Sequence, residues 1–296
     1  YGEGSLEVNA EFNNGITSKD NLEIENSNIT VNASNNGING KDSLVVNNAS
    51  LSVTSGADAL RSTNDTDTEK GYINLNNCAL ALVPGEDGIQ AETSLNINGG
   101  TYNITSGGGH SAELGEDASA KGVKAGGEIT ISDGTFTLDC ADDAVHSNGN
   151  VTVSGGEFNI NTGDDAFHAD SALKASGGKI NIESCYEGLE GSNVDVSGGE
   201  INIISSDDGL NSAGGNDKSG FGNGDPWQST GAHSIKISGG TLNITAGGDG
   251  LDSNGAMVIW GGRIAVSSST EDNGALDYDG ACTLTGGTLF AESRGG

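Results

Sequence analysis

The chain has 296 residues, with 42 Asp or Glu against 12 Lys or Arg, so its formal net charge is −30. This charge argues against nucleic acid and anionic membrane surfaces as partners, because both attract Lys and Arg. No apolar run approaches the ~20 residues that span a bilayer. The 50 glycines, with Trp 2, Tyr 5 and Phe 6, predict many tight turns and few large core residues.

A short motif recurs along the chain, in which an acidic residue, then Gly or Ala, precede an apolar residue. Clear copies are GEDGIQA (85–91), ADDAVHS (141–147) and GDDAFHA (163–169). We call the apolar residues the anchors: Ile16, Ile38, Leu60, Ile89, Val123, Val145, Phe167, Leu189, Leu210, Leu251 and Leu276. Successive anchors lie 22, 22, 29, 34, 22, 22, 22, 21, 41 and 25 residues apart. A basal period of 22 predicts a solenoid with loops inserted into some turns.

The elements expected along the chain begin with a partial cap in residues 1–14, which is followed by the coils. One coil is clear in residues 142–160, where apolar and polar residues alternate in 145–147, 151–153 and 158–160. Each of these pieces is too short for a helix and has the period of a strand. The pattern therefore predicts three short strands per coil.

A Gly pair separates the second and third strands of most coils, as at 155–156. Where the first Gly is missing, its place is taken by Asn26, Asn48, Asn77 or Asp133. Asn, Asp and Gly are the residues that tolerate a left-handed backbone conformation. This column of residues is therefore expected to form a corner with positive φ.

Together these features predict one all-β domain over residues 1–296, a right-handed, single-stranded parallel β-helix of about eleven coils. Insertions are expected at 63–71, 106–120 and 214–233, and such loops tend to gather on the binding side of a solenoid. The cysteines fall in different coils and are expected to be free, small and mostly buried. They are Cys78, Cys140, Cys185 and Cys282.

Acidic residues stand two positions before many anchors, and the residue before them is often acidic too. Carboxylates stacked about 5 Å apart repel by about 3 kcal/mol, and a cation between the coils removes that cost. Calcium takes about six to eight oxygens, which suits paired carboxylates, whereas hydrogen bonds to corner amides are the alternative explanation. We expect calcium as a cofactor. The candidate ligands are Asp142, Asp143, Asp164, Asp165, Glu187, Glu190, Asp207, Asp208, Asp249 and Asp252.

The residues that follow the anchors are expected to face solvent, among them His146 and His168 on adjacent coils. Two imidazoles without a third ligand at metal spacing indicate a pair beside acids rather than a zinc site. Trp260 lies in another solvent-facing column and Trp227 in the third insertion. A flat ring suits the face of a sugar, although packing of an insertion onto the rod is an alternative. All four residues are candidate carbohydrate contacts.

The repeat reads D-D-G/A-φ-H/D/N-S followed by φ-x-φ-x-G-G-x-φ-x-φ, and it is best seen in 141–160, 163–182 and 206–212 with 235–244. On this motif the chain resembles, over residues 15–291, a family of secreted β-helical carbohydrate-binding proteins of anaerobic bacteria, mainly clostridia. The fold of that family is similar to pectate lyases of polysaccharide lyase family nine.

This resemblance implies calcium binding, association with cellulose and acidic plant sugars, and a secreted or cell-surface location with a lipid anchor before processing. It carries the metal role onto Asp142, Asp143, Asp164, Asp165, Glu187, Asp207, Asp208 and Asp249. The sequence starts abruptly at Tyr1 without a signal peptide, so we expect a mature or trimmed secreted chain.

The function expected from these observations is non-catalytic, calcium-stabilised binding of cellulose or a polygalacturonate-like polysaccharide by a monomer at the bacterial cell surface. One alternative is a calcium-dependent pectate lyase, in which Lys124 or Lys121 would remove the C5 proton of the sugar. A Lys among acids usually has a raised pKa and makes a poor base. The other alternative is a structural, adhesin-type surface rod with no defined sugar.

Overall fold

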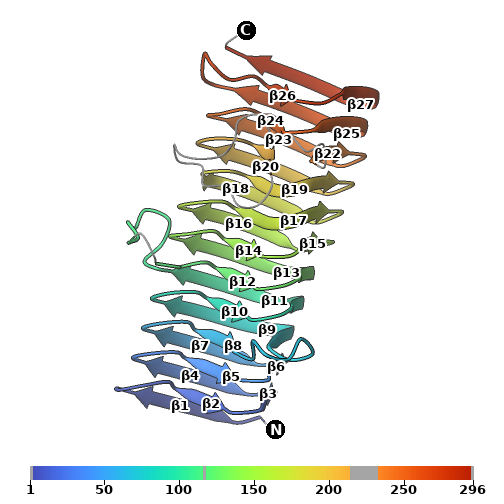
Figure 1. The fold of residues 1–296 in the computed structure, drawn as a ribbon. Coiled ribbons are helices and arrows are strands. Elements are labelled where there is room, and N and C mark those ends of the chain that lie inside the picture. Colours follow the sequence, from blue (N-terminus) through green and yellow to red (C-terminus); the bar gives the residue numbers. More distant parts are fainter. Residues whose placement is uncertain (1–2, 116–117, 214–232, 295–296) are drawn as a thin grey trace.

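The computed structural model describes residues 3–115, 118–213 and 233–294. In this part of the chain the fold is all-β, and 27 strands join into one sheet through parallel pairings. Figure 1 shows the strands stacked as successive coils from the N-terminal to the C-terminal end. The architecture is that of a β-helix-like solenoid. Among the described residues, no helix is long and apolar enough to cross a membrane.

Every anchor begins a strand. Nine of these strands have three residues: β2 (Ile16–Ser18), β5 (Ile38–Gly40), β8 (Leu60–Ser62), β10 (Ile89–Ala91), β12 (Val123–Ala125), β14 (Val145–Ser147), β21 (Leu210–Ser212), β24 (Leu251–Ser253) and β26 (Leu276–Tyr278). In two coils the first strand continues into the second: β17 (Phe167–Ala175) and β19 (Leu189–Val196).

The remaining strands are the second and third of each coil. The second strand stands alone as β3 (Asn21–Glu25), β6 (Ser43–Asn47), β15 (Val151–Val153) and β22 (Ser234–Ile237). The third strand stands alone as β1 (Ser5–Ala10), β4 (Asn28–Ala33), β7 (Ser50–Ser55), β16 (Glu157–Thr162), β18 (Lys179–Cys185), β20 (Glu200–Ser205) and β23 (Thr241–Ala246). Both run together in β9 (Tyr72–Pro84), β11 (Leu95–Ser106), β13 (Ile129–Cys140), β25 (Ala256–Ser268) and β27 (Cys282–Ser293).

The register of the sheet confirms the repeat that the anchors predict. Each anchor pairs with the anchor of the next coil, as in the series Val123, Val145 and Phe167. The pairing also holds across the longest gap, where Leu210 lies beside Leu251 although 41 residues separate them. Long connections therefore leave the stack without shifting the coils. As a result, equivalent positions of successive coils form straight columns of side chains.

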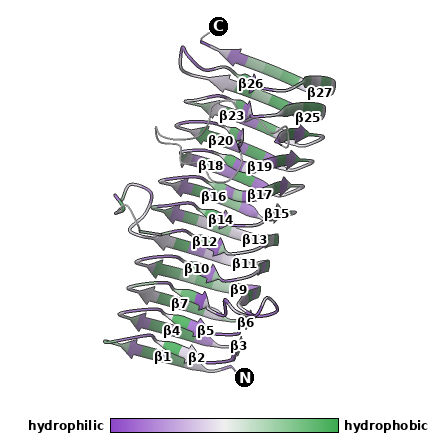
Figure 2. Ribbon diagram, viewed as in Figure 1, coloured by the Kyte–Doolittle hydropathy of each residue, from purple (hydrophilic) through white to green (hydrophobic). Residues whose placement is uncertain are grey.

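Apolar side chains alternate along the strands and form one buried core inside the stack. Figure 2 shows bands of hydrophobic and hydrophilic residues along the strands. The largest buried side chains are aromatic and lie on consecutive coils. The rings of Tyr102 and Phe136 stack with centroids 4.6 Å apart, and those of Phe136 and Phe158 with centroids 4.4 Å apart. Phe167 meets Phe158 edge-on at 5.5 Å. Phe167 precedes His168 in β17, so this aromatic cluster adjoins the polar columns described below.

The corner between the second and third strands has positive φ, as expected, but its position changes along the chain. In the early coils it is the first residue of the pair, since Asn26, Asn48 and Asn77 have φ of 51°, 50° and 53°. From Gly134 (φ 137°) onward it is the second residue of the pair. The expectation for Asp133 is therefore wrong, because the left-handed residue has moved one position on to Gly134.

Two of the expected insertions fold back on the coils. In residues 63–71, Asn64 Nδ2 donates to Asp42 Oδ1 at 2.7 Å, and Lys70 Nζ lies 2.9 Å from Asp42 Oδ2. In residues 106–120, Ser119 Oγ donates to Asp87 Oδ1 at 2.8 Å. The third insertion, 214–233, lies almost entirely outside the described residues, and so does Trp227.

The four cysteines are free, as expected, and three of them are buried. Cys282 is exposed, so the expectation of burial is wrong for this residue. The reason is its place in β27, the last described strand, which pairs with β25 on one side and with no other described strand on the other.

Candidate functional site

The column two residues before the anchors is a ladder of hydrogen bonds. One carboxylate oxygen accepts the backbone N–H of the equivalent residue on the next coil. Asp58 Oδ1 lies 3.1 Å from the nitrogen of Asp87, Asp143 Oδ1 3.0 Å from that of Asp165, and Asp165 Oδ1 3.1 Å from that of Glu187. The corner role of these acids is thus confirmed for one oxygen of each, and it leaves the second oxygen for another partner.

The second oxygen points to the side chain that follows the anchor, three residues along the same coil. Asp58 Oδ2 lies 3.3 Å from Arg61, and Asp143 Oδ2 lies 2.7 Å from His146 Nδ1. His168 lies 3.2 Å from Asp165 Oδ2 in the next coil. In the first half of the stack, a column of basic side chains therefore pairs with the column of acids.

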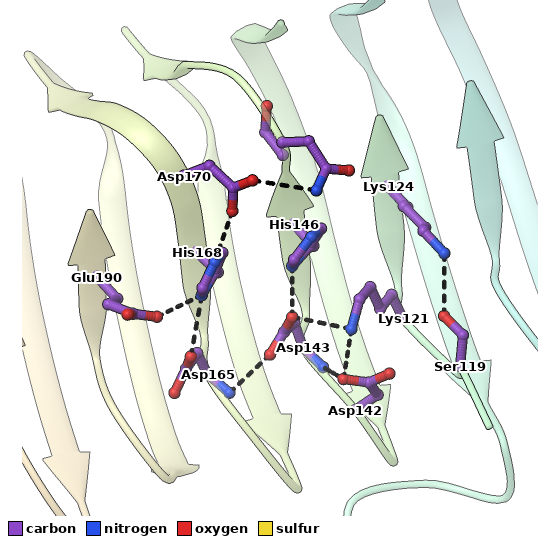
Figure 3. A network of polar contacts seen from close by, with 12 residues as sticks. Ser119, Lys121, Lys124, Asp142, Asp143, His146, Asp165, His168, Asp170 and Glu190 are labelled. Carbon is purple, nitrogen blue, oxygen red and sulfur yellow. Dashed lines mark hydrogen bonds and ion pairs between the residues drawn. The ribbon is translucent and has the colours of Figure 1, made fainter. Parts of the chain in front are cut away.

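Lys121 interrupts the acidic column, since it stands two residues before its anchor. Its Nζ lies 2.6 Å from Asp142 Oδ1 and 3.0 Å from Asp143 Oδ2 (Figure 3). Burial alone would lower the pKa of Lys121, but the charges of Asp143 and Asp142 raise it well above its usual range. Lys124 Nζ lies 3.2 Å from Asp87 Oδ2. Both lysines proposed as lyase bases are held by carboxylates.

The acids of the second half have no such cations. Among the described residues, no Lys, Arg or His forms an ion pair with Glu187, Asp208 or Asp252. Burial and the charges of Asp165 and Glu190 raise the pKa of Glu187 to about 10. Burial likewise raises the pKa of Asp208 to about 8 and that of Asp252 to about 7. Without a paired cation, these carboxylates ionise only at a higher pH than usual.

Several of these groups have the geometry to hold a metal ion. Ligand atoms lie within 4.8 Å of one another in three clusters: Asp142 with Asp143 and Asp164, Asp143 with His146 and His168, and Asp165 with His168 and Glu190. In addition, the Oδ1 atoms of Asp207 and Asp208 converge over Gly248, where a Cβ atom would lie 2.3 and 2.4 Å from them. Converging carboxylates that a side chain would displace fit a hard cation such as calcium.

The two histidines stack on each other, with ring centroids 4.6 Å apart and planes 12° apart. Their side chains are 14% and 11% exposed, and the next residues of the column, Glu190 and Asn211, are 1% and 3% exposed. The expectation that this column faces solvent is wrong here, because acids on both sides and neighbouring coils cover it. The spacing of Asp and His by three residues in adjacent repeats was the available signal for this network.

A groove of about 410 Å³ lies on the face formed by the second strands. It is lined by Trp260, whose side chain is 47% exposed, and by Lys174 and Lys236. The register places Lys174, Asp195 and Lys236 side by side on three successive coils. Sequence reasoning found Trp260 but missed the lysines, which recur in the outward column of the second strand.

A family model described as a carbohydrate-binding domain-containing protein matches the chain twice, over residues 1–166 and 164–293. The chain belongs to this family. Comparisons with curated proteins and with solved structures gave no match. The two matched segments meet between β16 and β17, where β14 pairs with β17 and β16 with β18 without a break. The family unit is therefore present twice in one continuous stack.

Proposed function

We propose that this protein is a non-catalytic polysaccharide-binding protein that calcium stabilises. Membership of a carbohydrate-binding family supports the ligand class. At the level of residues, the groove beside Trp260 carries the proposal. An exposed indole offers a flat apolar surface to a sugar ring, and Lys174 and Lys236, with Asp195 between them, leave one net positive charge in the same groove. This combination suits an acidic polysaccharide such as polygalacturonate better than an uncharged one such as cellulose.

Calcium would stabilise the acids of the second half of the stack. Glu187, Asp208 and Asp252 are buried or partly buried next to other carboxylates, without ion pairs in the described part of the chain. A divalent cation would remove this repulsion, and six to eight oxygens are what calcium takes. Asp207 and Asp208, whose Oδ1 atoms converge over Gly248, are candidate ligands in this half of the stack. A secreted or cell-surface location, a right-handed winding and a lyase-like fold belong to the same proposal and rest on the resemblance.

The lyase alternative is weaker because its two bases are occupied. Lys121 lies between two carboxylates that keep it protonated, and Lys124 pairs with Asp87. A general base has to release its proton near neutral pH. A structural rod, the other alternative, has no need of an exposed Trp in a basic groove.

Binding isotherms on polygalacturonate and pull-down on insoluble cellulose test the proposal, each with calcium and with chelator. Trp260→Ala should weaken binding to polygalacturonate roughly tenfold, which corresponds to about 1.4 kcal/mol. Tyr278→Ala is the matched control, since Tyr278 is 43% exposed in β26, outside the groove. Absence of saturable binding to both polysaccharides would refute the proposal, and release of unsaturated product would favour the lyase.

A further inference from the structure

Both ring nitrogens of His168 face carboxylates. Nε2 lies 3.2 Å from Asp170 Oδ1, whereas Nδ1 lies 3.2 Å from Asp165 Oδ2 and forms an ion pair with Glu190 Oε2. Figure 3 shows Asp165 and Glu190 approaching the same edge of the ring from two sides. His146, one coil below, differs because its Nδ1 has a single carboxylate, Asp143.

The contacts of the neighbours leave three ligand atoms directed at one point. Asp165 uses Oδ1 to accept the N–H of Glu187, so Oδ2 is the oxygen that faces His168. Glu190 is 1% exposed, and among the described residues neither of its oxygens has a hydrogen-bond partner apart from its contact with the His168 ring. The three ligand atoms lie within 4.8 Å of one another.

The contact with Asp170 decides how His168 can act. Without a metal, carboxylates at both ring nitrogens favour a ring that is protonated on both. A metal ion at Nδ1 would displace the proton there, while the Nε2–H would still donate to Asp170 Oδ1. Metal-binding histidines use this arrangement, in which a carboxylate accepts the N–H of the nitrogen that does not bind the metal. A proton on Nδ1 can be donated to only one of the two carboxylates at a time, whereas a metal ion can bind both.

We propose that Asp165, His168 and Glu190 bind a divalent transition metal of the zinc class. One imidazole nitrogen and two carboxylates are ligands that zinc accepts, whereas calcium prefers oxygen alone. Two ligands at about 2.1 Å from a tetrahedral ion lie about 3.4 Å apart, close to the 3.2 Å between His168 Nδ1 and Asp165 Oδ2. The contact between His168 Nδ1 and Glu190 Oε2 is shorter than this edge, so Glu190 would have to draw back to admit the ion. This site is distinct from the all-oxygen groups proposed for calcium.

The neighbouring cluster of Asp143 with the two histidines has less need of an ion. Asp143 Oδ2 already faces Lys121 at 3.0 Å and His146 at 2.7 Å, so positive charge is present there. The described residues place no Lys or Arg in an ion pair with Asp165 or Glu190. The metal is therefore expected at His168 and not at His146.

The test is titration of the chelator-treated, desalted full chain with zinc in a saturating excess of calcium, which occupies the all-oxygen groups. We expect one zinc per chain, a loss of affinity of about 100-fold in His168→Gln, and a change of less than about threefold in the matched control His146→Gln. Cobalt should give the visible absorption bands of a site with nitrogen and oxygen ligands, and His168→Gln should abolish them. Asp170→Asn should weaken zinc binding by about 10-fold to 100-fold, because it removes a partner of the bound ring.

Circular dichroism of each variant without metal shows whether it folds. If His168→Gln does not fold, the loss of zinc affinity in Asp170→Asn carries the test. Failure of wild-type chain to bind zinc in calcium, or equal zinc affinity in wild type and His168→Gln, would overturn the inference. The inference goes beyond the proposed function, and the two can fail separately. Calcium-dependent stability and polysaccharide binding are measured without zinc.

Discussion

Replacement of Lys121 by Met tests the charge balance on which the candidate site depends. The Lys121 side chain is 13% exposed and lies between Asp142 and Asp143, whose side chains are 11% and 5% exposed. Met keeps most of the apolar stem and removes the ammonium group. The variant therefore leaves two buried carboxylates without their common cation, while Asp143 keeps its contact with His146.

The expected loss in the free energy of unfolding is about 3–5 kcal/mol in chelator, the usual cost when one partner of a buried ion pair is removed. The stability of a typical domain is about 5–15 kcal/mol, so the loss is large. Calcium should restore part of it, because the carboxylates of Asp142, Asp143 and Asp164 lie close enough to share an ion. We therefore expect the variant to depend on calcium at this end of the column more strongly than the wild type does.

Urea unfolding at neutral pH, in chelator and in calcium, measures both effects. Lys121→Asn is the control, since Asn14 and Asn36 occupy the same column and accept backbone N–H groups of the next coil. It removes the same charge but keeps a polar side chain of the kind that this column carries elsewhere, so its loss should be smaller. A loss below about 1 kcal/mol for Lys121→Met in chelator, with no gain of calcium dependence, would refute the reasoning.

Three further predictions concern the acids, the corner and the core. In chelator the thermal midpoint should fall as the pH rises from 5 to 8, because the raised pKa values of about 8 for Asp208 and about 7 for Asp252 make ionisation above about pH 4 destabilise the fold. Calcium should make this fall smaller, and a midpoint that rises with pH would contradict the prediction. Gly100→Ala should destabilise the fold by more than about 2 kcal/mol in the same urea assay, since φ is 108° and a Cβ would lie 2.2 Å from the carbonyl oxygen of Cys78. Gly99→Asn should cost less than about 1 kcal/mol, since φ is 71° and the nearest atom to a Cβ would be Asn77 Oδ1 at 3.8 Å. Phe136→Ala should lose about 3–5 kcal/mol by urea unfolding, because its ring stacks between two others, and a loss below 1 kcal/mol would contradict that packing.

The stacking of coils could be predicted from the sequence because it depends on a local pattern that repeats. Each anchor marks the start of a strand, and a period of 22 places every anchor beside the next. The corner was harder to predict. Asn77 and Asp133 look equivalent in the sequence, but the left-handed residue is the first of the pair in one coil and the second in the other. Asn77 is followed by Cys78 and Asp133 by Gly134, so the left-handed conformation goes to the Gly where the second position has one and to the Asn where it does not. The first residue of the pair, taken alone, does not reveal this.

The candidate site was predictable in its residues but not in its charge balance. The aligned acids identify the column, yet the sequence does not show which oxygen the backbone of the next coil uses. Asp143 and Asp165 each give one oxygen to this ladder, and only the other remains for a cation. The burial of Glu190 also depends on neighbours from separate coils, which a single repeat does not reveal.

The two family units differ in how their acids are neutralised, and this difference bears on function. In the first, Arg61, Lys121 and Lys124 supply fixed positive charges to the column. In the second, from Glu187 onward, no ion pair with Lys or Arg reaches the column among the described residues. We therefore expect the first unit to depend less on added ions at neutral pH than the second. Metal occupancy should therefore control the half of the stack that also carries Trp260 and its groove.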